Sequence, residues 1–392
     1  MARAVLVACL GCTVLACSSP PLAPGPPSSG PSDPAPPRSG AVLVASGDHG
    51  GDLERSKAFF ETRAQMESPL TFAVDAPEGI PDLSAETCGA CHREIYAEWA
   101  VSTHAAAWTD PQFQKEIGKS DNTWLCLNCH TPLPAQKEFW PVGLVDDDVE
   151  RPELVVSPVF DKRLRDEGIT CAGCHVVDNV VVGPGLADSV APHPVRADPN
   201  FSTTAVCERC HQAVARYEGK SFECTFDTGS EWRDGPYPAE GTDCITCHMP
   251  RVDRPAAIGG PVRSVARHWW RGAGIPKKPG VYPPQEALPF GLEMEAVWGT
   301  SLEVTVANAN AGHLLPTGDP ERWIQIDVSF VDGEGASVGD AWTWRIGQTW
   351  EWWPAPKKLG DNRLAPRERR VFSVLVPQAA MRATVRASSH RM

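Results

Sequence analysis

The sequence predicts an α+β protein, in which a mainly helical, loop-rich domain precedes a C-terminal antiparallel β-sandwich-like domain. Two observations lead to this class. The pattern Cys-x-x-Cys-His occurs five times between Cys88 and His248, and each copy suits one short helical turn because positions i, i+3 and i+4 share a helix face. After about residue 275, apolar residues alternate with polar ones, which is the period of a strand with one buried face.

The first 17 residues have the pattern of an export signal. Arg3 precedes an apolar run from Ala4 to Ala16, which is too short to span a membrane. The run ends in Val14-Leu15-Ala16-Cys17, which resembles a bacterial lipobox, although Leu15 departs from the usual small residue. We expect a lipoprotein-type signal (1–17) and an anchor at Cys17 in the bacterial cell envelope, in the periplasm or outer membrane. Cys12 is a second candidate acceptor, and an ordinary signal peptide is the alternative.

Two short segments come after the signal. Residues 18–40 hold nine prolines in 23 positions, together with Ser and Gly, and predict a solvated, semi-extended tether. Residues 41–82 contain an apolar run, a helical pattern and a second apolar run, at Ala41–Ala45, Leu53–Met66 and Leu70–Val74. They predict a small β-α-β segment that packs on the residues after position 82.

The five motifs lie in residues 83–274, and a β-rich domain is expected over residues 275–392. A helix is expected to continue after the first motif, over Glu94–Trp108. Strands are expected where the apolar alternation is clearest, at Leu302–Val306, Ile324–Phe330, Trp342–Ile346, Val371–Val376 and Met381–Val385.

The repeated motif is the attachment signal for c-type haem. In each copy two thiols can bond to the porphyrin edge while the imidazole reaches the iron. Five covalently attached haems are therefore expected, at Cys88, Cys91, Cys126, Cys129, Cys171, Cys174, Cys207, Cys210, Cys244 and Cys247. The expected proximal iron ligands are His92, His130, His175, His211 and His248.

Zinc is the main alternative, because Cys-x-x-Cys pairs are also zinc half-sites, and a disulfide within each pair is another. Zinc does not require the histidine that comes directly after every pair. The export signal also sends the chain to a compartment where unligated cysteines oxidise. Cys224, outside the motifs, is interpreted as a buried thiol, with an intermolecular disulfide or a haem contact as the alternatives.

The formal charge is −13, and the propionates of five haems would make the surface more acidic. Nucleic acid is therefore excluded as a partner. Redox proteins, either cytochromes or quinol-linked complexes, are the expected partners, together with the membrane through the lipid anchor.

The chain resembles the cytochrome c554-like multihaem cytochromes and, more distantly, hydroxylamine oxidoreductase and pentahaem nitrite reductase. The resemblance runs from about Leu83 to the C-terminus. It is carried by Glu86–His92 with Ile95, Tyr96 and Trp99, by Ser102–Ala105, Gly168–His175, the Pro-His-Pro around His193, Cys244–Pro250 and the Gly-His-x-x-Pro-Thr-Gly around His313.

The resemblance implies that four further histidines are distal iron ligands, namely His104, His193, His268 and His313. His268 has core packing beside its Trp neighbours as an alternative. Five irons would then have only four expected distal ligands. His49 is the candidate for the fifth, whereas His390 is expected to be solvated. Alternatively one iron is open, and the resemblance points to the haem of His130.

The expected function is that of an exported, membrane-anchored pentahaem cytochrome that carries electrons between redox partners. The alternative is an oxidoreductase that acts on a small nitrogen or sulfur species at one five-coordinate haem. No Cys-x-x-Cys-Lys motif is present, and none of the four tyrosines is secured as the crosslink of hydroxylamine oxidoreductase. We therefore favour electron transfer over an enzyme and name no catalytic residue. A third interpretation makes the β-rich domain a partner-binding module.

Overall fold

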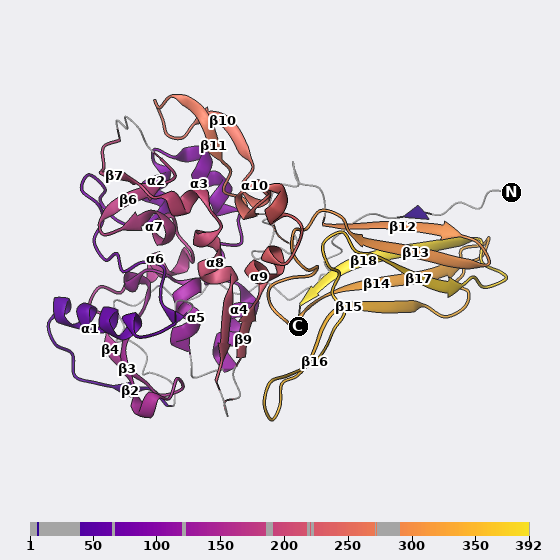
Figure 1. Cartoon of the computed structure of the whole chain (residues 1–392), viewed down its shortest axis with the longest axis horizontal. Helices are drawn as coiled ribbons and strands as arrows, with labels where there is room; N and C mark the ends of the chain where they lie inside the picture. Colours follow the sequence, from indigo (N-terminus) through magenta and orange to yellow (C-terminus); the bar gives the residue numbers. More distant parts are fainter. Residues whose placement is uncertain are drawn as a thin grey trace, which may run out of the picture.

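The computed structural model describes residues 6–7, 40–64, 67–119, 123–185, 191–217, 220, 223–270, 272 and 291–391. The lipobox-like sequence at residues 14–17 and the tether predicted over residues 18–40, apart from residue 40, lie outside these ranges. Figure 1 shows helices and short strands at one end of the molecule and long strands at the other. We call residues 40–270 the motif region and residues 291–391 the β region. The α+β class is confirmed.

The motif region is built from short helices joined by loops. Its helices are α1 (His49–Glu61), α2 (Ala85–Gly89), α3 (Arg93–Ala100), α4 (Pro111–Lys119), α5 (Thr123–His130), α6 (Lys162–Asp166), α7 (Cys171–His175), α8 (Ala205–His211), α9 (Thr228–Arg233) and α10 (Cys244–His248). Four 3-10 turns add η2 (Pro134–Gln136), η3 (Val145–Asp147), η4 (Pro199–Ser202) and η5 (Pro238–Glu240). Most of these helices are too short to be stable alone, so their positions depend on tertiary packing.

Small sheets join the helices of the motif region. The three-stranded sheets contain β2 (Val42–Leu43), β4 (Pro152–Val156) and β3 (Phe139–Leu144), and β5 (Val176–Val177), β6 (Val180–Gly183) and β7 (Val195–Ala197). The two-stranded sheets pair β8 (Ala213–Arg216) with β9 (Glu223–Phe226), and β10 (Arg251–Pro255) with β11 (Val262–Ala266). Cys224 lies in β9, opposite Ala215 of β8.

The segment predicted as β-α-β over residues 41–82 contains the first strand and the helix but not the second strand. β2 pairs with β4, more than a hundred residues further along the chain. Residues 70–74 form a loop instead. Phe72 of this loop packs on Phe60 of α1, in a cluster with Trp124 of α5. The apolar run thus fills an aromatic core rather than a sheet.

The helix predicted over Glu94–Trp108 ends earlier, because α3 stops at Ala100 and turns continue to Thr109. The backbone around His104 makes hydrogen bonds other than those of a helix. The carbonyl of His104 accepts from the amides of Ala107 and Ile169, both at 3.0 Å. The hydroxyl of Ser102 accepts from the amide of Ala105 at 3.3 Å. His104 therefore sits on a turn and not on a helix.

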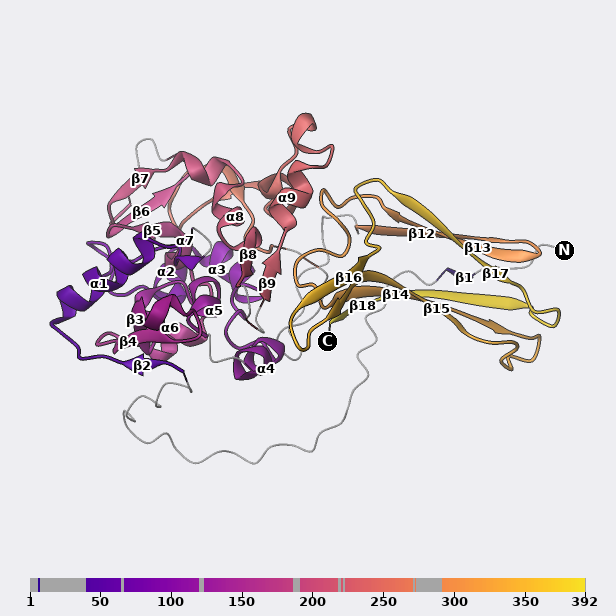
Figure 2. The ribbon, with the colours of Figure 1, turned by 60° about the horizontal axis from the view of Figure 1, so that its bottom comes forward.

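The β region consists of two sheets that face each other (Figure 2). One contains β12 (Leu292–Trp298), β13 (Ser301–Asn308) and β17 (Arg369–Leu375). The other runs in the order β1-β18-β14-β15-β16, with β14 (Arg322–Val331), β15 (Trp342–Glu351), β16 (Lys357–Asp361), β18 (Arg382–Arg391) and β1 (Leu6–Val7). Strands coincide with the five predicted stretches, except that Val376 and Met381 lie just outside β17 and β18; β1, β12 and β16 were not predicted.

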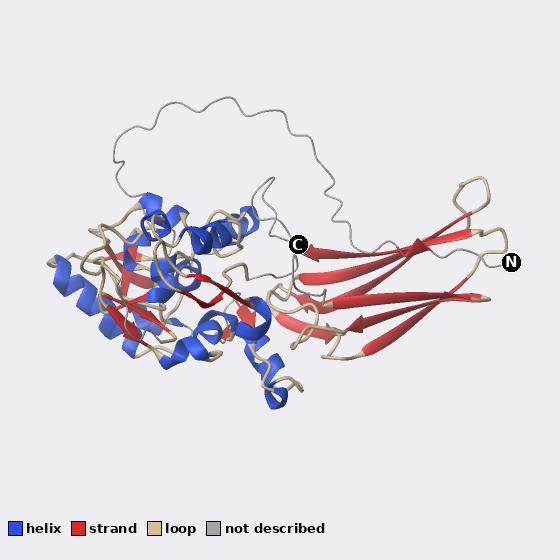
Figure 3. Ribbon diagram, turned by 90° about the horizontal axis from the view of Figure 1, so that it is seen from above, coloured by secondary structure: helices blue, strands red, loops and turns tan. Residues whose placement is uncertain are grey.

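Alternation explains why these strands form a sandwich. Residues 302, 304 and 306 of β13 and residues 324, 326 and 328 of β14 point into one shared apolar core, because successive side chains of a strand point to opposite faces. The core also takes Ile346, Val374 and Val385. Figure 3 shows the long strands running away from the helical part, so the loops at one end of the sandwich meet the motif region.

Direct contacts join the two regions at that end. Arg363 of the β region contacts Glu231 of α9 at 2.5 Å, and each side chain of this pair is only 6% exposed. Thr317 donates to the same carboxylate, and Arg391 of β18 reaches Asp110 at 3.4 Å. The end of the sandwich is therefore fastened to the motif region by buried charge as well as by packing. Among the described residues, no helix is long and apolar enough to cross a membrane.

Candidate haem sites

Each Cys-x-x-Cys-His motif lies on a helical turn, as the spacing predicted. The second to fifth motifs occupy α5, α7, α8 and α10. The first motif spans the end of α2 and the turn before α3, where the amide of His92 donates to the carbonyl of Cys88 at 2.9 Å. The two thiols and the imidazole of each motif are thus held by one local turn of backbone.

Three of the motif histidines have one ring nitrogen fixed by the backbone. The Nδ1 atoms of His92, His130 and His175 lie 2.8 Å from the carbonyl oxygens of residues 256, 107 and 182. A carbonyl can only accept, so Nδ1 carries the proton and Nε2 keeps its lone pair. This is the tautomer in which Nε2 can bind a metal, and the backbone bond fixes the orientation of the ring.

In two of the predicted distal histidines, a backbone carbonyl fixes the Nδ1 atom in the same way. Nδ1 of His268 lies 3.0 Å from the carbonyl of Ala266, and Nδ1 of His313 lies 2.9 Å from that of Leu314. Both rings therefore present Nε2 as an acceptor.

The motif histidines and predicted distal histidines meet in three pairs. The ring centroids of His104 and His211 are 6.3 Å apart, those of His175 and His268 are 6.2 Å apart, and those of His248 and His313 are 6.4 Å apart. An imidazole nitrogen binds a first-row metal at about 2.0 Å, and the centroid lies about 1.2 Å behind that nitrogen, so imidazoles on opposite sides of one metal have centroids about 6.4 Å apart. All three pairs have this separation.

Desolvation favours the neutral form of five of the six paired histidines. Burial, reinforced by neighbouring histidines, lowers the pKa of His104 to about 3 and that of His211 to about 4. Burial likewise lowers the pKa of His268 to about 4 and lowers those of His175 and His313. A neutral imidazole is the form that ligates iron. Among the described residues, no three His, Cys, Asp or Glu side chains converge as a chelating group.

The other candidates are placed differently. His193 lies on a half-exposed loop, with Nδ1 3.4 Å from the carbonyl of Pro194, and among the described residues no ring contact joins it to a motif histidine. His49 begins α1, and its side chain lies outside the described part. Both assignments stay predictions. His390 is not simply solvated: it stacks on Trp323 at 5.1 Å and bonds Ser388 at 2.7 Å.

The haem of His130 was the suggested site of an open iron. The ring of His130 stacks on Phe113 of α4, with 3.6 Å between the centroids and 2° between the planes. This contact positions the imidazole from its face and does not involve the metal-binding nitrogen. An open iron at this motif stays a prediction.

Thiols of different motifs also meet. The Cys88 thiol of the first motif interacts with the Cys171 thiol of the third, and this interaction lowers the pKa of Cys88. In the same way Cys129 of the second motif meets Cys210 of the fourth, and Cys207 of the fourth meets Cys244 of the fifth. These interactions link the first motif to the third, and the second and fifth motifs to the fourth. The third and fourth motifs are linked by the charge of Cys174, which acts on both Cys207 and Cys210. The motifs therefore form one cluster.

The sequence analysis missed Glu98, which holds His268 in place. Glu98 is 5% exposed and accepts from both terminal nitrogens of Arg254, at 2.7 and 2.8 Å, and from Arg267 at 3.0 Å. The same carboxylate accepts from the backbone amide of His268 at 2.9 Å. A Glu in the pattern of an amphipathic helix reads as solvated, and only the tertiary arrangement reveals its role.

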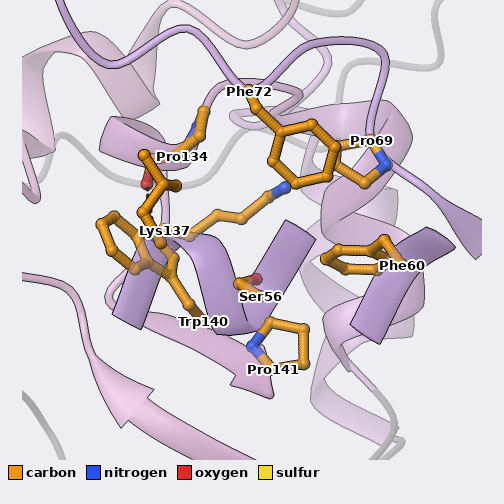
Figure 4. A pocket seen from close by; sticks show the side chains of 9 residues that line it. Ser56, Phe60, Pro69, Phe72, Pro134, Lys137, Trp140 and Pro141 are labelled. Carbon is orange, nitrogen blue, oxygen red and sulfur yellow. Dashed lines mark hydrogen bonds between the residues drawn. The ribbon is translucent and has the colours of Figure 1, made fainter. Parts of the chain in front are cut away.

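The second missed residue is Lys137, which is buried beside the second motif. Its side chain crosses a small cavity between Phe60, Phe72 and Trp140 (Figure 4). Its amino group donates to Asn128 of α5 at 3.1 Å. Burial lowers the pKa of Lys137 to about 7, and the neighbouring Cys129 thiolate opposes that shift.

These residues fit c-type haem: paired thiols on a turn, a neutral motif imidazole and, at three motifs, a second imidazole at the separation that one iron requires. The class of protein is therefore a multihaem c-type cytochrome. The family model for cytochrome c554 and c-prime matches residues 87–148, which include the first two motifs. Over these residues the chain is similar to the cytochrome c554 family, as the sequence predicted.

A solved structure has a similar fold. It is a penta-heme cytochrome c552 from Thermochromatium tepidum, with a TM-score of 0.52 and 19% sequence identity; the match covers 78% of this chain and 89% of that one. At this identity the similarity shows the fold alone. No curated protein matches the sequence.

Proposed function

We propose that this chain is an electron-transfer cytochrome that carries five covalently attached haems, one at each motif. The observation that carries the proposal is the set of three histidine pairs, because the two histidines of each pair would both hold one iron and leave it no free position. A six-coordinate iron cannot bind a substrate directly, which suits one-electron transfer better than catalysis.

Each bound haem supplies a one-electron iron centre. The chain would hold it by the two cysteines of the motif and the motif histidine. His104, His268 and His313 would complete the fourth, third and fifth sites. His193 and His49 are proposed to serve the two remaining motifs. The bonds from Nδ1 to the backbone fix the ring orientations, so these sites need little rearrangement when the iron changes charge.

The contacts between motifs support a carrier with several connected centres. The thiols of the fourth motif interact with those of the second and the fifth, and a thiol of the first interacts with one of the third. A cluster of this kind offers more than one exit to partner proteins. With a charge of −13, the surface favours redox partners that present basic patches.

Electron paramagnetic resonance of the purified, oxidised protein tests the proposal, together with a haemochrome assay for stoichiometry. We expect five haems per chain and signals that are low-spin for at least the three paired sites. Fewer than three low-spin haems would overturn it. A high-spin fraction that changes on adding nitrite, hydroxylamine or sulfite would favour the oxidoreductase.

We also propose that the protein is exported and anchored by a lipid at Cys17, on the basis of the apolar run and lipobox-like sequence before that residue. Two or more acyl chains give stable membrane attachment. The check is the haem stain of membrane fractions: Cys17→Ser should move the protein to the soluble fraction and Cys12→Ser should not. The reverse result would identify Cys12 as the acceptor, and no change in either variant would exclude lipidation.

A further inference from the structure

Arg322 is a half-buried cation that forms no ion pair with the other described residues, at the end of the β region that meets the motif region. It opens β14, directly opposite Arg391 of β18 in the antiparallel register. The Nε atom of Arg322 is buried and has no hydrogen-bond partner within the part of the chain that the structure describes. A buried donor without an acceptor is unfavourable, so an acceptor with negative charge would stabilise this site.

The nearby carboxylates are already committed to another arginine. The charges of Asp319 and Asp110 act on Arg322, but both carboxylates are held by Arg391, at 2.7 and 3.4 Å. Burial, followed by the charge of Arg391, lowers the pKa of Arg322, yet an arginine keeps its proton in proteins. The site therefore has a permanent positive charge and a free donor.

The backbone makes room for the guanidinium. Gly318 has a φ of +84°, and a Cβ added there would lie 3.3 Å from Nη1 of Arg322 and 3.8 Å from the ring of Phe226 in β9. The guanidinium thus lies in the contact between the two regions. Phe226 pairs with Ala213 of β8, two residues after His211, so the guanidinium lies close to the fourth motif.

We propose that Arg322 binds a propionate carboxylate of the haem held by His211 and His104. The proposal rests on the proposed haem at the fourth motif. Propionates are the anionic groups of a haem, and the planar fork of a guanidinium matches a carboxylate with two parallel hydrogen bonds. A soluble oxyanion offers the same chemistry, but the propionate is present in every copy of the loaded protein.

The first test compares Arg322→Gln with Arg386→Gln in the haem-loaded protein. Arg386 is an exposed arginine of β18, so its substitution removes the same charge from the same region. In Arg322→Gln we expect a shifted propionate-bending band in the resonance Raman spectrum. We also expect one midpoint potential to fall, because removing a nearby positive charge favours the oxidised iron. A tenfold change in the oxidised-to-reduced ratio corresponds to about 59 mV.

A second substitution identifies the haem. His104→Met should raise the potential of the haem at the fourth motif and so mark it in a redox titration. Adding Arg322→Gln should then move that marked component and no other. A shift confined to a different component would overturn the assignment to this haem.

The remaining outcomes are distinguishable. Where Arg322→Gln does not fold, Arg322→Lys keeps the charge but loses the bidentate contact, so it should shift the Raman band with little change in potential. Unchanged bands and potentials with five haems present would overturn this inference alone, whereas a missing fourth haem would contradict the proposed function. A soluble oxyanion is the other possible ligand of Arg322, and titration of the wild type with nitrite, sulfite or phosphate tests for it. A change in potential on adding one of these anions that disappears in Arg322→Gln would assign the site to a soluble oxyanion and overturn the propionate.

Discussion

At the scale of single residues, burial decides which groups are charged around the motifs. The histidines that face each other are neutral because desolvation and the charges of neighbouring side chains lower their pKa. Lys137 is a lysine whose charge is also decided by burial. Its pKa falls from 10.5 to about 7, mainly through burial. Once Cys129 forms a thioether it can no longer ionise, which removes the charge that opposes this shift.

Lys137 therefore predicts a dependence of stability on pH. Between about pH 7 and pH 10.5 the unfolded lysine binds a proton that the folded one lacks, so the free energy of unfolding should rise with pH, by up to about 1.4 kcal/mol per unit. Below pH 7 both states are protonated and this slope disappears. We expect Lys137→Met to be more stable at pH 7 and to lose the slope.

Guanidinium unfolding of the haem-loaded protein at pH 6, 7, 8.5 and 10 measures this slope. Lys115 of α4 is exposed, so Lys115→Met is the matched control and should keep the slope of the wild type. A slope that persists in Lys137→Met would show that another group titrates.

At the scale of elements, the sequence predicts what is local and misses what is distant. The motif helices follow from a five-residue spacing, and the long strands of the β region follow from strict alternation over one shared core. The helix expected over Glu94–Trp108 ends at Ala100, because the His104 carbonyl accepts from the amide of Ile169, a residue far along the chain. Residues 70–74 likewise look like a strand until Phe72 finds the aromatic cluster.

The pairing of histidines has the same limit. Resemblance to a family indicated that His104, His268 and His313 are ligands, but not which motif each one faces. That choice depends on the path of the chain between them. For His268 it depends on a contact that no motif contains, the carboxylate of Glu98 on α3, which joins α3 to the residues after β11.

Substitution of Glu98 tests this link between elements. Glu98→Gln leaves Arg254, which is 7% exposed, without its buried bidentate partner and with only the exposed Glu94 at 3.2 Å, and breaking a buried pair costs about 3–5 kcal/mol. We expect reduced stability and, because the amide of His268 loses a charged acceptor, a smaller low-spin signal from one haem. The control is Glu94→Gln, whose side chain is 68% exposed and also contacts Arg254. Equal effects of the two substitutions on the spin state would contradict a positioning role for Glu98.

At the scale of the whole molecule, two kinds of contact fasten the β region to the motifs. One is the buried polar contact of Arg363 and Thr317 with Glu231. The other is His313, which lies between β13 and β14 and faces His248 of α10. Bound iron would turn the second contact into a covalent-like link between regions. The redox site and the docking of the β region are thus properties of one side chain.

His313→Ala separates these two roles. We expect one low-spin haem to become high-spin and the protein to unfold at a lower temperature, because the link to the β region is lost as well as the ligand. Free imidazole can fill the axial position but cannot hold the β region. It should therefore restore the low-spin spectrum without restoring the unfolding temperature. Spin state by electron paramagnetic resonance and unfolding by calorimetry measure the two effects, with His390→Ala as the control. If imidazole restores both, His313 is a ligand with no docking role, and an unchanged spectrum in His313→Ala would remove it from the iron altogether.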